Sequence, residues 1–128
     1  MERKDRQKTG RKGEELVCQY LIEQGHSIVE RNWRCGHLEV DIISVARDGI
    51  HFVEVKSRTV PLMAQPEENV GYRKQARIAT AARRYLALRD DRLLGEMEVW
   101  LDVAAVTFTG EKGEITWFPG AYVPIHYG

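Results

Sequence analysis

Residues 37–58 constrain the fold of this chain more than any other stretch, because two apolar, β-branched runs flank the dipeptide Asp48-Gly49. Asp-Gly is a common sequence of the two-residue type I′ turn, since both of its positions tolerate positive φ. The stretch therefore predicts a β-hairpin in which Arg47 faces Ile50.

This register predicts which side chains share a face of the hairpin. Directly opposed residues lie on the same face and successive residues alternate, so Asp41 is expected opposite Lys56 and Ile43 opposite Glu54. One face is then core, with Leu38, Val40, Ile42, Val53 and Val55. The other face gathers the charged side chains Glu39, Asp41, Glu54, Lys56 and Arg58.

Length and composition indicate one globular domain. The chain has 128 residues, of which 43% are hydrophobic and 30% charged, and it has no apolar run of the roughly 18 residues that a membrane helix needs. We expect a flexible basic N-terminus over residues 1–8 and a single domain over residues 9–128. The charged N-terminus lacks the apolar segment of a secretory signal, which favours a cytoplasmic protein without a membrane partner.

The two cysteines carry little information about function. A cytoplasmic chain of this size is expected to keep Cys18 and Cys35 reduced. Cys35 and His37 lack a second pair of ligands at zinc spacing, so the sequence does not predict a structural zinc site.

Charge is balanced overall but unevenly distributed. Residues 1–12 hold six basic and two acidic side chains, and residues 72–92 hold seven and two. Residues 13–71, by contrast, hold five basic and ten acidic side chains. The two basic segments are either ordinary solvated surface or a phosphate-binding rim around the acidic face of the hairpin.

The order of predicted elements is α-β-β-β-α-β-β. A helix is expected from Thr9 or Gly10 to Gln24, with Gly25 as its stop, followed by a strand over residues 27–33 and the hairpin. A second helix is expected over residues 67–89, and strands over residues 97–108 and 114–118, the last at a sheet edge. This order predicts an α/β fold with a mixed central sheet flanked by helices.

Two polar residues lie beside the apolar stripes of the predicted helices. Glu14 lies at the edge of the first stripe, where the helix dipole favours a carboxylate and where its side chain can lean over the surface that the helix packs on. Gln75 extends the second stripe backwards by one turn, and a buried glutamine needs hydrogen-bond partners.

The polar face of the hairpin has the donors of a magnesium site. Asp41 and Glu54 offer the hard oxygen ligands that Mg²⁺ or Mn²⁺ prefers, and Lys56 can orient an attacking water or stabilise charge on a phosphate. The alternative is an exposed strand face of paired opposite charges, which contributes only a few tenths of a kcal/mol per pair.

The spacing of Asp41 and Glu54-Val55-Lys56 resembles the PD-(D/E)xK nuclease signature, and the whole pattern is more similar still to the uncharacterised bacterial YraN-like family, itself similar to archaeal Holliday junction resolvases. The residues that carry this resemblance are Gly10, Gly13-Glu14, Tyr20-Leu21, Asn32-Trp33-Arg34, Glu39-Val40-Asp41, Phe52 to Arg58, Arg73-Lys74-Gln75, Tyr85-Leu86 and Asp102-Val103. Two positions depart from the family pattern: Leu38 stands where the family usually has Gly, and Trp117 where it often has His.

The resemblance implies a restriction-endonuclease-like fold and a set of site residues. It implies that Asp41 and Glu54 ligate Mg²⁺ or Mn²⁺, that Glu14 reaches the metal from the first helix, and that Lys56 is the catalytic lysine. Gln75 would help to position metal or phosphate. With the basic segments, it predicts contacts to nucleic acid from Arg11, Lys12, Arg58, Arg73, Lys74 and Arg77.

The sequence therefore favours a cytoplasmic, metal-dependent nuclease acting on DNA, with branched DNA as one candidate substrate. Two alternatives remain: a nucleic-acid-binding module with an inactive site, and an adaptor that pairs with a partner through the edge of the last hairpin. The resemblance also predicts a homodimer, with Trp100 and Trp117 near the contact.

Overall fold

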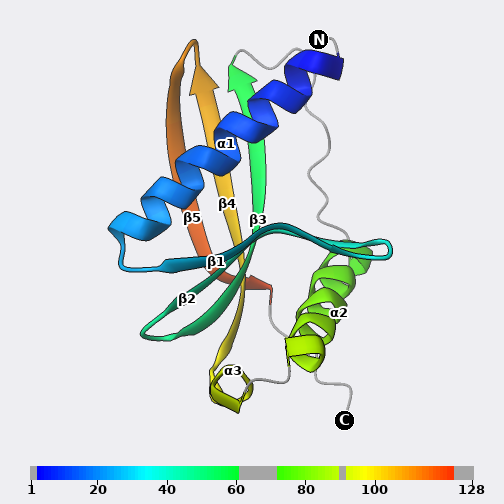
Figure 1. Ribbon diagram of the computed structural model, residues 1–128. Helices are drawn as coiled ribbons and strands as arrows, with labels where there is room; N and C mark the ends of the chain where they lie inside the picture. Colours follow the sequence, from blue (N-terminus) through cyan, green and yellow to red (C-terminus); the bar gives the residue numbers. More distant parts are fainter. Residues whose placement is uncertain (1–2, 61–71, 90–91, 123–128) are drawn as a thin grey trace.

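The computed structural model describes residues 3–60, 72–89 and 92–122, which form a five-stranded mixed sheet with a helix on each face (Figure 1). Strand order in the sheet follows the chain, β1-β2-β3-β4-β5. The elements are α1 Arg3–Glu23, β1 Ser27–Cys35, β2 Leu38–Ala46, β3 Gly49–Val60, α2 Tyr72–Arg89, α3 Arg92–Glu96, β4 Val99–Thr109 and β5 Lys112–Tyr122. The predicted α/β class and element order are confirmed, with the short α3 added. Residues 67–71 of the second predicted helix lie outside the described residues.

The first helix is longer than the sequence predicted. α1 begins at Arg3 rather than at Thr9 or Gly10, because residues 3–8 contain no Gly, Pro or β-branched residue to interrupt it. Its end is as predicted: Gly25 has φ 94°, and the His26 amide donates to the Leu21 carbonyl at 2.9 Å.

The predicted hairpin is present, but its register is different. Ala46 pairs with Gly49 and Ile43 with Phe52, so the turn is Arg47-Asp48 and neither turn residue has positive φ. The predicted pairings of Asp41 with Lys56 and of Ile43 with Glu54 are therefore wrong. Gly49 is needed for a close approach instead: a Cβ atom there would lie 2.1 Å from the carbonyl oxygen of Glu98.

The prediction of a single core face is also wrong, because both faces of the sheet are buried. Val17 and Leu21 of α1 pack against Ile42 and Val53 in a cluster that continues through Ala104, Val106 and Phe108. On the other face, the α2 side chains pack in a cluster that contains Val40, Ile43, Phe52, Ile78, Ala81, Tyr85 and Leu101.

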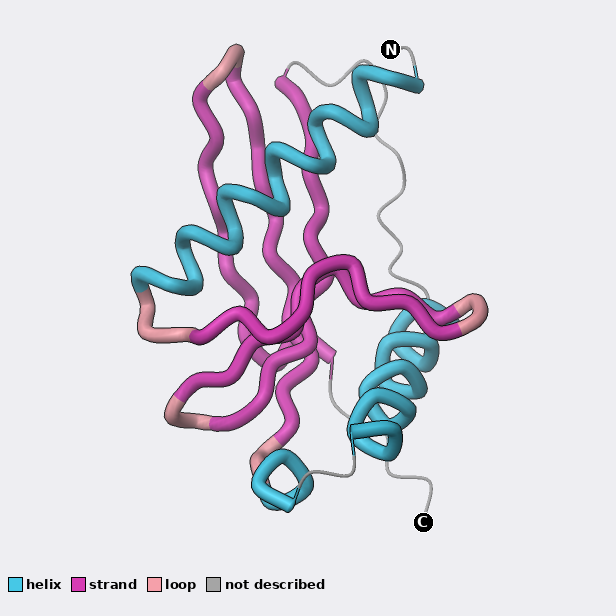
Figure 2. The backbone as a smooth tube through the Cα atoms, viewed as in Figure 1, coloured by secondary structure: helices cyan, strands magenta, loops and turns pink. Residues whose placement is uncertain are grey.

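The two halves of the sheet differ in strand direction. β1, β2 and β3 form an antiparallel meander, β3 and β4 are parallel, and β5 pairs antiparallel to β4 at the predicted edge. The parallel pair requires a crossover connection, and α2 lies within it. In Figures 1 and 2 the β1–β2 ribbon leaves the sheet and extends towards α2. Within the described residues, the helices lack the length and apolar character needed to cross a membrane.

Candidate carboxylate site

Asp41 lies where β2 separates from β3. The β2–β3 ladder ends at the pair Ile42 and Val53, and one residue further the Asp41 side chain accepts a hydrogen bond from the Val55 amide at 2.9 Å. Burial raises the pKa of Asp41 to about 6. The hydrogen bond from Val55 lowers this pKa, and the carboxylates of Glu14, Glu39 and Glu54 raise it further. Extending the register places Asp41 opposite Glu54.

Glu14 reaches this position from α1 because the helix lies unusually close to β3. A Cβ atom on Gly13 would lie 1.8 Å from Ser57 Oγ, so the absence of a side chain allows the approach. The half-buried Glu14 accepts a hydrogen bond from the Asn32 side chain, and burial raises its pKa despite this bond and the nearby Arg31. The structure thus brings Glu14 and Asp41 together.

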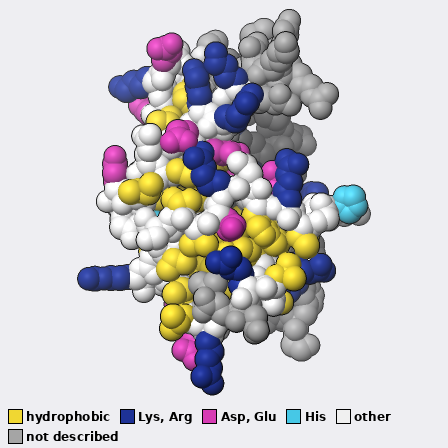
Figure 3. All heavy atoms as spheres, in the orientation of Figure 1, with side chains coloured by type: hydrophobic (Ala, Val, Ile, Leu, Met, Phe, Trp, Pro, Cys, Tyr) yellow, Lys and Arg dark blue, Asp and Glu magenta, His cyan; other side chains and the backbone are white. Residues whose placement is uncertain are grey.

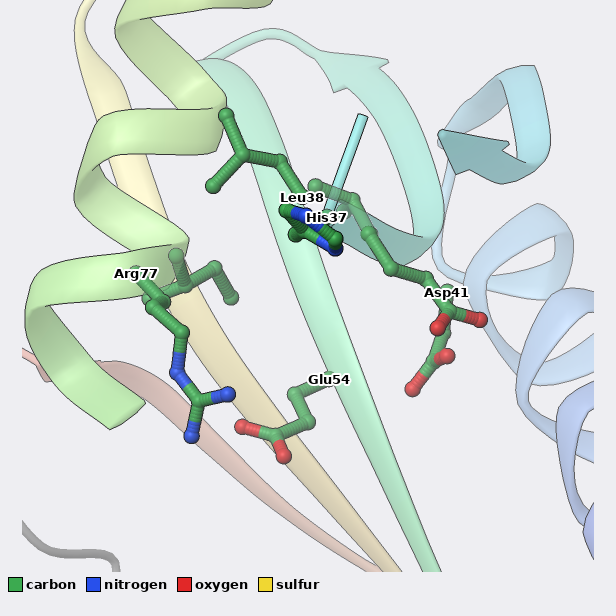
Figure 4. Close-up of a pocket in the computed structure, with 8 residues that line it drawn as sticks. His37, Leu38, Asp41, Glu54 and Arg77 are labelled. Carbon is green, nitrogen blue, oxygen red and sulfur yellow. The ribbon is translucent and has the colours of Figure 1, made fainter. Parts of the chain in front are cut away.

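Glu54 faces a cavity on the α2 side of the sheet. The cavity has a volume of about 280 Å³ and is lined by His37, Leu38, Glu39, Val40, Asp41, Glu54, Arg77 and Ile78. In Figure 4 the Glu54 carboxylate extends towards the Arg77 guanidinium, whereas Asp41 lies on the opposite side of the β3 ribbon. Carboxylates of both strands therefore border one opening, but their oxygen atoms point in different directions.

The remaining predicted site residues are only partly placed. Lys56 and Arg58 are half-buried on β3, beyond Glu54, and both interact with other groups. Gln75 lies in the first turns of α2, and its side chain is outside the described part of the structure. Among the described side chains, no group of three or more His, Cys, Asp or Glu residues converges as it would around a metal ion.

The predicted nucleic-acid contacts lie on two helices and one strand. Arg11 and Lys12 are exposed on α1, and Figure 3 shows several Lys and Arg side chains over the N-terminal part of this helix. Arg77 is exposed on α2, at the opening of the cavity. Arg73 and Lys74 belong to α2, but their side chains are outside the described residues.

Sequence reasoning missed a buried polar cluster at the other end of the sheet. His51 is 2% exposed, and its Nδ1 lies 2.5 Å from Asp102 Oδ2 and its Nε2 2.7 Å from Asp48 Oδ1. The other Asp102 oxygen accepts from the Gly120 amide at 2.7 Å. The sequence signal was one polar residue in each of two apolar strands, since buried polar groups need partners.

Trp100 and His26 complete this cluster. The Trp100 ring stacks on His51 with centroids 5.8 Å apart and donates from Nε1 to the Asp48 carbonyl at 2.9 Å. The His26 ring lies 4.6 Å from that of His51 and hydrogen-bonds Ser44 Oγ through Nδ1 at 2.9 Å. Trp117 is partly buried against Tyr20 and His26. Both tryptophans predicted at a dimer contact thus make contacts within their own chain.

Fold and site together define an α/β protein whose mixed sheet carries a half-buried carboxylate group between a basic helix and an open cavity. The chain belongs to the uncharacterised protein family UPF0102, whose model matches residues 13–106. The predicted membership of the YraN-like family is thereby confirmed. The matched residues include Glu14, Asp41, Glu54, Lys56 and Gln75.

Relatives from several bacteria carry the same family name. The UPF0102 protein of Myxococcus xanthus is 36% identical over 118 residues, which are 92% of this chain and 91% of the relative. The UPF0102 protein of Syntrophotalea carbinolica is 40% identical over 113 residues, 88% of this chain and 89% of the relative. Family membership therefore extends over nearly the whole chain.

One solved structure is more distantly similar. The protein in "The structure of Pyrococcus Furiosus SfsA in complex with Ca2+" aligns with 87% of this chain and 62% of its own, at 17% sequence identity and a TM-score of 0.41. Similarity at this level is too low to carry an argument about function.

Proposed function

We propose that this protein is a Mg²⁺-dependent nuclease that hydrolyses phosphodiester bonds in DNA, with branched DNA as the first substrate class to test. The observation that carries the proposal is the raised pKa of the Asp41 carboxyl. Burial, together with the neighbouring carboxylates, raises this pKa to about 6. Grouping carboxylates in a half-buried position destabilises a protein unless a cation or a catalytic role compensates for it. Here the group also borders an opening large enough to admit part of a substrate.

The donor chemistry of this group fits a hard divalent cation. Asp41, Glu54 and Glu14 are the residues that would hold Mg²⁺ or Mn²⁺, because these cations prefer carboxylate oxygens. When bound, such a cation polarises a phosphate and makes a bound water more acidic. Holding it requires the Glu54 side chain to turn from the direction of Arg77 towards Asp41.

The chain's other residues supply binding and charge stabilisation. Lys56 stabilises the negative charge that develops on the phosphate during hydrolysis, and Gln75 helps to orient that phosphate. Arg77 at the mouth of the cavity, together with Arg11 and Lys12 on α1, binds phosphates of the substrate backbone and positions it. These contacts fix the position of the DNA without reading its sequence.

The direction of the Glu54 side chain favours a second candidate function. A nucleic-acid-binding module needs basic residues but no converging carboxylates, and the described carboxylates do not converge. Such a module, acting alone or as an adaptor in DNA processing, would bind DNA without cleaving it and without needing a metal ion.

Mn²⁺ calorimetry combined with single-turnover cleavage separates the two functions. We expect Asp41→Ala and Glu54→Ala each to weaken Mn²⁺ binding and abolish cleavage, because each removes a donor and a negative charge. Lys56→Ala should keep Mn²⁺ and lose about 100-fold or more in rate, the scale for loss of one transition-state stabiliser. Glu111→Ala, in the exposed β4–β5 turn, is the matched control.

A parent protein that binds DNA but shows neither Mn²⁺ binding nor cleavage would establish the binding module and refute the nuclease.

Self-association is tested separately. The homodimer stays a prediction, and sedimentation that shows only monomer at tens of micromolar, with and without DNA, would contradict it.

A further inference from the structure

Asn32 in β1 has an unusual backbone conformation. Among the described residues it is the one residue other than glycine with positive φ, at 52°. The left-handed region is unfavourable for most L-residues, although Asn tolerates it better than most. A residue held there in the middle of a strand points to a local structural demand, and such residues cluster at functional sites.

The position of Asn32 in the sheet is directly across from Asp41. Its neighbours pair as Arg31 with Ile42 and Trp33 with Val40, so the register puts Asn32 opposite Asp41 between these two pairs. The left-handed residue and the central carboxylate therefore lie at the same level of the hairpin.

The β1–β2 ribbon bends at the level of Asn32 and Asp41. Val40 and Ile42 are two residues apart and would share a face in a regular strand. Instead, Ile42 packs in the cluster under α1, and Val40 packs in the cluster under α2. The bend carries the β1–β2 ribbon from the sheet towards α2, as Figure 1 shows. Asp41, at the bend, remains free to bond the β3 backbone at Val55.

The Asn32 side chain contacts the second carboxylate of the site. It lies close enough to Glu14 of α1 to donate a hydrogen bond, which lowers the pKa of that carboxyl. One residue before it, Arg31 forms an ion pair with Glu15 at 2.9 Å, so two successive β1 side chains bind two successive α1 side chains. The Arg31–Glu15 pair is about half exposed, whereas Glu14 is half-buried and its charge acts on Asp41.

We propose that Asn32 is a positioning residue of the carboxylate site: its left-handed backbone bends the hairpin at Asp41, and its carboxamide holds the Glu14 carboxylate beside Asp41. The proposal rests on the proposed function, since it assigns Asn32 to the support of the same metal-binding carboxylates. Partners that orient metal ligands typically affect metal affinity by 10-fold to 100-fold when removed.

Two substitutions separate the backbone role from the side-chain role. Asn32→Gly keeps the left-handed conformation at no steric cost and removes the amide donor. Asn32→Ala removes the same donor and disfavours the conformation. We expect Asn32→Gly to unfold at a temperature close to that of the parent and to bind Mn²⁺ on the order of 10-fold more weakly. Asn32→Ala should unfold at a lower temperature than Asn32→Gly.

An Asn32→Gly protein that binds Mn²⁺ as tightly as the parent would overturn the side-chain role, because the glycine then supplies all that the site requires. The Mn²⁺ titration is informative only if the parent protein binds Mn²⁺. A measurement on the metal-free protein is free of this condition, so it distinguishes failure of this inference from failure of the proposed function.

Nuclear magnetic resonance of the metal-free protein reports the Asn32–Glu14 hydrogen bond directly. We expect Glu14→Ala to shift the side-chain amide signals of Asn32 and to speed their exchange with water. Glu15→Ala, which removes the neighbouring carboxylate and its ion pair with Arg31, is the matched control and should leave these signals nearly unchanged. Asn32 signals that do not respond to Glu14→Ala would overturn the inference, whatever the metal titration shows. A response together with no Mn²⁺ binding by the parent would uphold the positioning of Glu14 and refute the proposed function.

Discussion

The buried His51–Asp102 pair predicts how this protein's stability depends on pH. Both ring nitrogens of His51 lie within hydrogen-bond distance of a carboxylate, Asp102 on one side and Asp48 on the other. An ionised carboxylate only accepts hydrogen bonds, so two ionised partners favour the form of His51 in which both nitrogens carry protons, the imidazolium cation. Burial opposes this charge, but the hydrogen bonds from His51 to Asp102 and Asp48 outweigh burial and raise the pKa of His51 above its usual 6.5.

The sign of the pH dependence follows from linkage. Because the folded protein binds the His51 proton more tightly than the unfolded chain does, the stabilisation is complete below pH 6.5 and is lost as pH rises through the folded pKa. Burial and the nearby His51 charge lower the pKa of His26, so its effect lies below pH 6.5 and has the opposite sign. The raised pKa of Asp41, about 6, also acts mainly below neutral pH. The window above pH 7 therefore reports mainly on His51.

Substitution at Asp102 gives the magnitude. Asp102→Ala leaves the Gly120 amide and His51 Nδ1 without partners, and loss of one member of a buried pair costs about 3 to 5 kcal/mol. Asp102→Asn has a cheaper arrangement: its oxygen accepts from Gly120 and its amide donates to a neutral His51. That change replaces a charged hydrogen bond by a neutral one and should cost about 1 to 2 kcal/mol.

Urea unfolding of the parent and both variants at pH 6 and pH 9 is the assay. With a typical urea slope of about 2 kcal/mol per molar, Asp102→Ala should lower the midpoint by about 1.5 to 2.5 M at pH 6. The parent should lose stability between pH 6 and pH 9, and Asp102→Asn should lose much less. A parent that is equally stable at both pH values, or an Asp102→Asn variant with the parent's pH dependence, would refute the imidazolium assignment.

Two other predictions test the position of α1 and the proposed DNA-binding surface. Gly13→Ala should lower the free energy of unfolding by about 1 to 2 kcal/mol by overpacking, because its new Cβ would lie 3.1 Å from Ser57 Cβ. Adding Ser57→Gly should reverse the loss. Equal costs of Gly13→Ala with and without Ser57→Gly, measured by urea unfolding, would contradict the close packing. DNA affinity should fall steeply with salt. Replacing Arg73, Lys74 and Arg77 of α2 together should flatten the slope of log binding constant against log salt concentration on duplex DNA by up to about 0.9 per lost contact. A slope that does not change would remove α2 from the interface.

The sequence predicted the order of elements well and the geometry of the site only in part. Alternating apolar residues identified the hairpin, and the run up to Gly25 identified the end of α1. The register prediction failed because Gly49 allows the close approach of Glu98, the residue before β4, and the local Asp48-Gly49 pattern cannot reveal a contact so distant in the sequence. A local pattern specifies which turns are possible, and the packing of the rest of the chain selects one of them.

The supporting residues of the two polar clusters were not predictable for similar reasons. Asn32 has no local turn signature, and its left-handed backbone is explained only by the bend between the two cores. His51 and Asp102 are 51 residues apart, and each looked like an isolated polar residue in an apolar strand. Asp41 and Glu54 were found because the hairpin pattern gathers charged side chains on one face and because their spacing resembles a nuclease signature, and Glu14 was found because of its place on the helix.

Single-turnover cleavage on one panel of single-stranded, duplex, flap and four-way DNA, with Mg²⁺, Mn²⁺ or a chelator, tests the proposed metal-dependent nuclease most directly. We expect cleavage of at least one branched substrate that requires the metal ion, disappears in Asp41→Ala and Glu54→Ala, and persists in Glu111→Ala. Cleavage that survives the chelator or both carboxylate substitutions would contradict it, and so would a folded parent protein that binds these DNAs and cleaves none of them.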